Sequence, residues 1–97
     1  MIKKVKFLKE FVLSLEKIKD EKLLAIIAMR IHRIRNGNFG DSKSCGDGVS
    51  EIRIHYGSGY RLYYAIREQD IVILLCSGDK SEQQNKLKMA KQLAKEI

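Results

Sequence analysis

The sequence has no proline, no tryptophan and few cysteines among its 97 residues. Its two cysteines, Cys45 and Cys76, form no CxxC pair and have no zinc-finger spacing with the two histidines, so we expect neither a metal site nor a disulfide framework. No apolar run approaches the ~18 residues that span a bilayer, and residues 1–9 lack the apolar block of a signal peptide. We therefore expect a cytoplasmic protein with no cofactor and no membrane contact.

The chain also lacks any sign of a second domain. It has no linker rich in proline, serine or glycine and no internal repeat, so residues 1–97 are predicted to form one domain, too small for a multi-step enzyme. Hydrophobic residues make up 44% and charged residues 32%, which allows a small core beneath a charged surface. The net charge of +7 favours nucleic acid or an acidic protein as a partner.

Hydrophobic periodicity predicts the element order β-α-α-β-β-β-α. The expected strands are 2–6, 49–56, 60–66 and 71–77, the expected helices are 8–18, 20–35 and 81–97, and the glycine-rich stretch 37–48 is expected to be a loop. Asp20 is the predicted N-cap of the second helix, and Ser81 begins a capping box. The predicted fold is α+β, with a helical hairpin and a C-terminal helix packed on a small, mostly antiparallel sheet.

The predicted strands place polar side chains together on one face. If Tyr56 lies opposite Tyr60, antiparallel pairing sets His55 against Arg61 and Arg53 against Tyr63. The same face then holds the following charged residues: Glu51, Arg53, His55 and Arg61. Pairing of Arg61 with Cys76 in the next hairpin brings Lys80 close to them. Because the opposite, apolar face is expected to be covered by helices, the charged face is expected to be open to a ligand.

This group of side chains matches the needs of phosphodiester cleavage by an RNA 2′-hydroxyl. Such cleavage needs a base for the hydroxyl, here Glu51 or His55, together with cations for the charge that develops on the phosphate. Tyr60 and Tyr63 flank Arg61, and aromatic rings beside a cation are typical of single-stranded RNA sites. Lys86 is a further candidate for RNA binding. The alternative is that these residues form only a solvated sheet face, with the tyrosines in the core.

Three segments resemble the RelE/ParE superfamily of toxin–antitoxin toxins, and most of all its small HigB-like "addiction module killer" group. They are Gly59-Tyr60-Arg61-Leu62-Tyr63-Tyr64, Leu74-Leu75-Cys76-Ser77-Gly78-Asp79-Lys80-Ser81 and Asn36-Gly37-Asn38-Phe39-Gly40-Asp41. The resemblance implies a microbial-RNase-like fold and, for the RelE branch, metal-independent cleavage of mRNA on the ribosome. It also implies a cognate antitoxin, through which alone the toxin would reach operator DNA.

By position, the resemblance assigns Arg61 to the scissile phosphate and Lys80 to the basic position after the last strand. Arg53 and His55 lie on the strand where relatives carry catalytic residues. One departure is that no Tyr or His follows Tyr64, although several active relatives have one near the C-terminus. The leading hypothesis is a ribosome-dependent mRNA endonuclease toxin. The alternatives are a ParE-like, non-enzymatic inhibitor of DNA gyrase and a basic RNA-binding module without catalysis.

Overall fold

The structure, a computed structural model, describes residues 2–97, and within them it has α+β architecture. The elements are β1 (Lys4–Phe7), α1 (Lys9–Glu16), α2 (Glu21–Arg35), β2 (Ser42–Gly46), β3 (Val49–Ile54), β4 (Tyr60–Arg67), β5 (Ile71–Asp79), the 3-10 turn η1 (Lys80–Glu82) and α3 (Gln83–Glu96). The strands form one mixed sheet in the order β1-β5-β4-β3-β2, in which only β1 and β5, of the strands described, run parallel. The predicted α+β class and mostly antiparallel sheet are confirmed, with one strand more than expected.

The additional strand, β2, lies in the stretch that was predicted to be a loop. It pairs antiparallel with β3 through a two-residue turn, Asp47-Gly48, in which both residues have positive φ angles of 56° and 76°. An Asp-Gly pair with this geometry is a strong hairpin signal. The density of glycine, serine and aspartate around it led to the wrong prediction of a loop.

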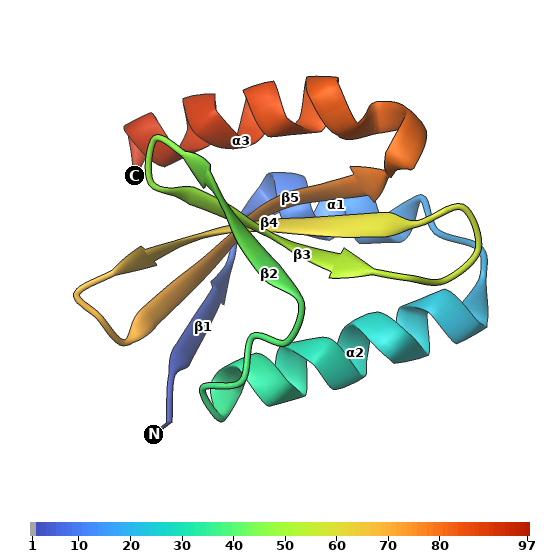
Figure 1. Cartoon of the computed structure of the whole chain (residues 1–97), viewed down its shortest axis with the longest axis horizontal. Coiled ribbons are helices and arrows are strands. Elements are labelled where there is room, and N and C mark those ends of the chain that lie inside the picture. Colours follow the sequence, from blue (N-terminus) through green and yellow to red (C-terminus); the bar gives the residue numbers. More distant parts are fainter. Residues whose placement is uncertain (1) are drawn as a thin grey trace.

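Helices cover both faces of the sheet (Figure 1), with α3 on one side and α1 and α2 on the other. One core contains Phe11 of α1, three isoleucines of α2 and the inward residues Ile52, Ile54, Leu62 and Tyr64 of the sheet. The second core joins Ala90 and Ala94 of α3 to Tyr63, Ala65 and Leu75. The expectation of an uncovered charged face was therefore wrong over most of its length, because α3 lies on it.

The first two helices also differ from the predicted tight hairpin. Four residues, 17–20, separate them, and α1 packs along β5 rather than against α2. Asp20 caps α2 as predicted, since its carboxylate accepts hydrogen bonds from the backbone N–H groups of Lys22 and Leu23 at 3.0 and 3.2 Å. The capping box before α3 lies two residues earlier than predicted, on Asp79 and Glu82.

The strand register is shifted by two residues from the prediction. Arg53 lies opposite Arg61 because the β3–β4 loop spans the five residues 55–59 rather than three. Arg61 lies opposite Gly78 because the β4–β5 turn has three residues, 68–70, and the pairing is shifted by a bulge between Tyr63 and Tyr64. A shift of two residues leaves the side chains of β3 and β4 on their predicted faces. It also brings Arg61 next to the end of β5, so Lys80 follows directly beyond the pair.

Candidate phosphate-binding site

The candidate site lies at the end of the sheet where β3 and β5 end and β4 begins. Arg53 and Arg61 are cross-strand neighbours, and the backbone N–H of Lys80 donates to the carbonyl of Gly59 at 3.3 Å. With His55 and the loop 57–60, these residues line an open groove of about 340 Å³. The groove lies beyond the part of the sheet that α3 covers. Four of the five predicted catalytic residues, namely Arg53, His55, Arg61 and Lys80, thus line one surface.

Glu51 is the fifth, and it lies beneath the groove rather than in it. Its side chain is only 7% exposed, and its Oε2 atom accepts a hydrogen bond from Arg61 Nε at 3.3 Å and lies 3.9 Å from Arg53 Nε. Its other oxygen, Oε1, accepts from the Cys45 thiol at 3.4 Å. A buried carboxylate engaged on both oxygens has no open position for a substrate proton. Glu51 therefore orients the two guanidinium groups, and the prediction of Glu51 as a general base does not fit this geometry.

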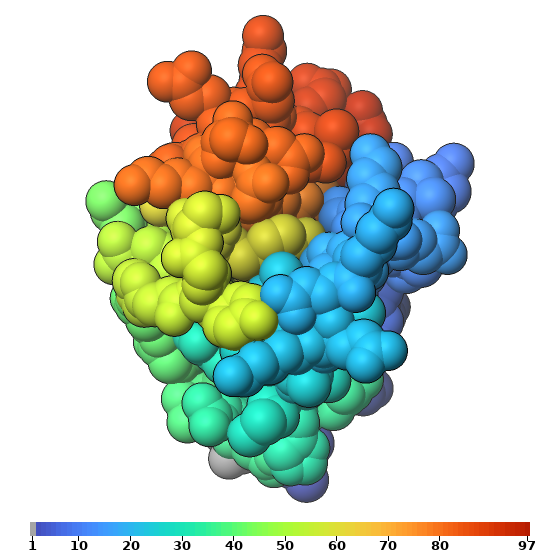
Figure 2. Space-filling model, turned by 90° about the vertical axis from the view of Figure 1, so that its right-hand side faces the viewer, coloured from blue at the N-terminus to red at the C-terminus, as the bar shows by residue number. Residues whose placement is uncertain are grey.

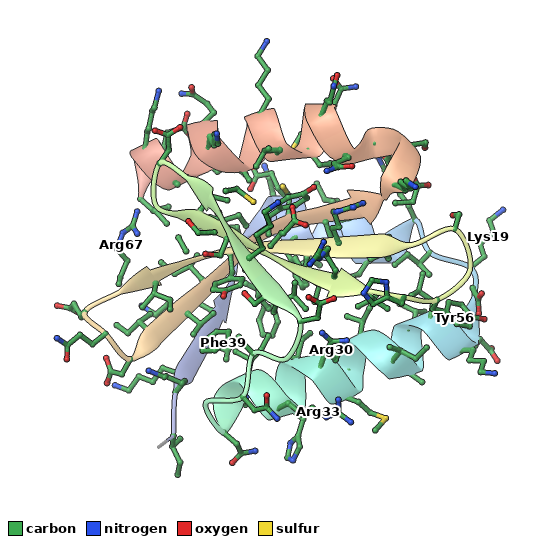
Figure 3. The ribbon with its side chains drawn as sticks, viewed as in Figure 1. Lys19, Arg30, Arg33, Phe39, Tyr56 and Arg67 are labelled. Carbon is green, nitrogen blue, oxygen red and sulfur yellow. The ribbon has the colours of Figure 1, made fainter. Side chains whose placement is uncertain are left out.

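Arg53 receives support from two further elements. Arg30 of α2 donates from Nη2 to the carbonyl oxygen of Arg53 at 3.2 Å and so ties the end of β3 to the helix (Figure 3). The side chain of Arg53 donates to Asp41 at 3.1 Å. Gly40 has a φ of +63°, and a Cβ added there would lie 3.1 Å from the Arg30 guanidinium. The segment before β2 can approach Arg30 closely because Gly40 has no side chain.

Asp41 also binds the histidine of the site. Its Oδ2 atom lies 2.6 Å from His55 Nε2, while Oδ1 is bonded to Arg53. The hydrogen bond from His55, followed by that from Arg53, lowers the pKa of Asp41. An ionised carboxylate can only accept, so His55 Nε2 is the donor and Nδ1 is directed elsewhere. Sequence analysis missed Asp41, which was treated as a turn residue; the hairpin of β2 and β3 brings it back to the site.

The two tyrosines that were candidates for RNA stacking lie in the two cores. Tyr63 is fully buried beneath α3, where desolvation raises its pKa to about 12. Tyr60 is 7% exposed on the opposite face, and its hydroxyl lies 2.8 Å from Ser77 Oγ. Stacking of a base on Tyr63 is excluded by its burial, and Tyr60 has little exposed surface to offer to the groove.

Lys86 comes from the first turns of α3 and reaches across the end of β5. A Cβ built on Gly78 would lie 2.8 Å from Lys86 Cγ, so the lysine stem fills the space left by the glycine. Gly78 is the strand partner of Arg61. Lys86 therefore lies beside the basic groove, although its backbone belongs to the helix that covers the neighbouring part of the sheet.

Neither cysteine adds a reactive or metal-binding group. Desolvation raises the pKa of Cys45 to about 11 and that of the buried Cys76 to about 12. Within residues 2–97 no three His, Cys, Asp or Glu side chains are grouped so that they could hold a metal ion. None of the helices in that range is long and apolar enough to cross a membrane.

The protein is thus a small α+β domain with a cationic groove at one end of its sheet, and the arginine and lysine side chains of such a groove can contact phosphate groups. Residues 9–97 match the family described as phage-derived protein Gp49-like, and the chain belongs to this family. The family is toxin-like, of the kind found in addiction modules. An uncharacterized protein of Haemophilus influenzae is 49% identical over 83 residues, which cover 86% of this chain and 84% of the relative.

Proposed function

We propose that this protein is the toxin of a toxin–antitoxin pair and acts as a metal-independent endoribonuclease on mRNA at the ribosome. Its membership of a toxin-like family supports the first part. The observation that carries the second is the arrangement of Arg61, Arg53 and His55 around two fixed carboxylates in one open groove. The resemblance of the Gly59–Tyr64 and Leu74–Ser81 segments to RelE/ParE and HigB-like toxins points to the same activity.

In the proposed reaction the 2′-hydroxyl of one nucleotide attacks the adjacent phosphorus, which forms a 2′,3′-cyclic phosphate and breaks the P–O5′ bond. His55 accepts the hydroxyl proton at Nδ1, because its Nε2–H is held by Asp41. Arg61 and Arg53 stabilise the charge that develops on the non-bridging oxygens. Lys80, exposed at the rim, donates the proton that the 5′-oxygen leaving group requires.

Purified protein, ribosomes and a defined mRNA test this proposal directly. Primer extension should reveal cleavage that persists in EDTA and leaves 5′-hydroxyl ends. Arg61→Lys keeps the charge but loses the planar fork, so cleavage should fall by ~10²–10³, the usual cost of one lost transition-state contact. Lys88→Ala, at an exposed position on α3, is the control and should cleave normally.

A supercoiling assay tests the alternative target. If the protein leaves mRNA intact but blocks DNA gyrase, the ribonuclease proposal is wrong and the ParE-like function replaces it. Binding of RNA without cleavage under any of these conditions would instead leave a basic RNA-binding module. Pulse labelling in cells tests the same choice: if the ribonuclease proposal is right, protein synthesis should stop before DNA synthesis.

The partner of the toxin is an antitoxin with an acidic, amphipathic segment. The chain carries a net charge of +7, and Val12 and Leu13 on α1 are 43% and 47% exposed. An acidic segment with apolar side chains complements both features. Co-expression of the adjacent open reading frame should restore growth, and the absence of any complex between the two purified proteins would contradict a toxin–antitoxin pair.

A further inference from the structure

A second hollow, of about 490 Å³, opens on the other side of the β3–β4 loop from the basic groove. Its walls are the α1–α2 turn, the β3–β4 loop and the start of η1 and α3. Figure 2 shows it between the blue α1–α2 segment, the yellow-green loop and the orange beginning of α3. In Figure 3, Lys19 and Tyr56 mark the same end of the molecule. No role has been given to this hollow, which we call the turn pocket, in the proposed reaction.

The lining of the turn pocket combines apolar walls with polar groups of both kinds. Ile18, Leu23 and Tyr56 provide apolar and aromatic surface, and the exposed Ser58 contributes a hydroxyl group, whereas the Ser14 and Ser77 hydroxyls are already bonded within the fold. A nucleobase needs such a mixture, namely flat apolar contacts for its faces and both donors and acceptors for its edge. The volume is of the size that small-molecule pockets have.

The turn pocket has three lysines and three carboxylates and therefore no net formal charge, but its lysines are placed to contact a phosphate. Its three carboxylates are all engaged: Asp20 accepts from the Tyr56 hydroxyl at 2.9 Å and from the α2 backbone, and Asp79 and Glu82 form the reciprocal capping box. In contrast, the lysines Lys17, Lys19 and Lys86 form no ion pair within residues 2–97. Their ammonium groups are free to contact an anion at the rim.

The turn pocket and the basic groove are adjacent. The loop 57–60 lines both of them, and Lys86 connects them because its stem crosses Gly78, the strand partner of Arg61. Because the two hollows share residues 57–60, a polynucleotide strand that leaves the groove can enter the turn pocket directly. Both hollows would then contact one continuous strand.

We infer that the turn pocket receives one unstacked nucleotide of single-stranded RNA next to the phosphate held by Arg61. The base enters against Tyr56 and Ile18, and its own phosphate contacts Lys17 and Lys19. This inference rests on the proposed function and adds to it a place where a base is selected. Sequence-specific proteins usually recognise RNA through such splayed bases.

Binding of uncleavable 2′-O-methyl oligoribonucleotides tests the inference. A dinucleotide fills only the basic groove, whereas a tetranucleotide also reaches the turn pocket. The double variant Lys17→Ala, Lys19→Ala should bind the tetranucleotide about tenfold more weakly, and the dependence on salt should fall by roughly 1.4 in log–log slope. For the dinucleotide the loss should stay within about twofold.

The matched control removes the same charge elsewhere. Lys88→Ala, Lys95→Ala changes two exposed lysines of α3 that line neither hollow, and it should bind both oligonucleotides like the wild type. If the control loses as much affinity as the Lys17/Lys19 variant, only the net charge matters and the inference is wrong. Methyl NMR signals of Ile18 and Leu23 should shift with the tetranucleotide and not with the dinucleotide.

Failure of this inference is distinguishable from failure of the proposed function. If Arg61→Lys weakens dinucleotide binding while the Lys17/Lys19 variant changes nothing, the groove binds RNA and the turn pocket does not. If no oligonucleotide binds at all, the inference is wrong, whereas the proposed function is decided by the cleavage assay on ribosomes. If the Ile18 and Leu23 signals respond to the antitoxin but not to RNA, the turn pocket is a protein-docking site and the inference is overturned.

Discussion

The Asp41 carboxylate holds His55 Nε2 at 2.6 Å, although 14 residues separate the two in the sequence. The same carboxylate accepts a hydrogen bond from Arg53, so one anion connects the proposed proton acceptor with one of the proposed phosphate-binding cations. A carboxylate behind a histidine fixes its tautomer and the orientation of its ring, and it stabilises the imidazolium that forms when the histidine takes up a proton. Asp41 is in this respect a positioning residue for His55.

Asp41→Asn should lower the rate of mRNA cleavage at least about tenfold with little change in RNA affinity, because an amide can bond either His55 tautomer. The pH dependence of cleavage should also shift, which a merely structural role would not produce. Primer extension over pH 5.5–8.5 measures both. Asp47→Asn is the control, since within residues 2–97 the Asp47 side chain pairs with Lys91 alone, at 3.4 Å on the β2–β3 hairpin. Equal losses in the two variants would contradict the role of Asp41.

Arg61→Ala should destabilise the fold and should also abolish mRNA cleavage. The side chain of Arg61 is only 16% exposed, and its removal leaves the buried Glu51 with Arg53 at 3.9 Å and a thiol as its remaining partners. The free energy of unfolding should fall by about 1–3 kcal/mol, the usual cost of an unsatisfied buried polar group. This differs from the change of about ±0.5 kcal/mol expected for an exposed arginine.

The double variant Glu51→Gln, Arg61→Ala separates the two effects. Neutralising the buried acid should restore part of the lost stability in urea denaturation, whereas cleavage should remain absent. Arg33→Ala, at an exposed position on α2, controls for the loss of an arginine and should stay within about 0.5 kcal/mol of the wild type. Active, stable Arg61→Ala protein would show that Arg61 contributes neither to the reaction nor to the fold.

Local patterns in the sequence predicted which face each residue of β3 and β4 occupies. Ile52, Ile54 and Leu62 pack on the helices as expected, because alternation has a period of two residues and needs no knowledge of distant contacts. The register depended on more than this pattern. The β3–β4 loop has five residues, and Tyr56 within it bonds Asp20, which lies 36 residues away on the N-cap of α2. No local signal reports such a contact.

The covered part of the polar face was missed for a related reason. Alternation shows that Glu51 and Tyr63 share a face, but it does not show what lies on that face. The narrow apolar stripe of α3 contains Ala90 and Ala94, whose small side chains let the helix approach the sheet closely. The predicted cluster therefore has two parts: Glu51 is buried beneath α3 and pairs with the arginines, whereas Arg61 lies at the edge of the groove.

The two thiols should react slowly in the folded protein. At pH 8 the pKa values of about 11 for Cys45 and about 12 for Cys76 leave almost no thiolate, and Cys76 is also fully buried. A colorimetric disulfide reagent should modify both only after urea is added. Rapid modification of Cys76 without urea would show that α3 opens from the sheet.

The same shifts make the fold sensitive to alkali. An unfolded cysteine ionises near its ordinary pKa of about 9, whereas the folded Cys76 thiol stays protonated up to about pH 12. Ionisation therefore favours the unfolded chain, and the free energy of unfolding should fall as the pH rises from about 9 toward 12, with no contribution from this group below pH 9. Cys76→Ala should show a shallower fall than the wild type over this range.

The β4–β5 turn offers a position where stability can be gained. Glu68 and Gln69 have φ angles of 53° and 68°, a left-handed conformation that costs a non-glycine residue roughly 1–2 kcal/mol. Gln69→Gly removes this strain. The greater flexibility of the unfolded chain lowers the free energy of unfolding by about 0.5–1 kcal/mol, which offsets part of the gain. Lys3 Nζ donates to the backbone carbonyl of Gln69, so this contact does not need the Gln69 side chain and is kept. The free energy of unfolding should rise by about 0.5–1 kcal/mol in urea denaturation, whereas Ser50→Gly within β3 should lower it. A Gln69→Gly variant that unfolds as readily as Ser50→Gly would show that the turn is not strained.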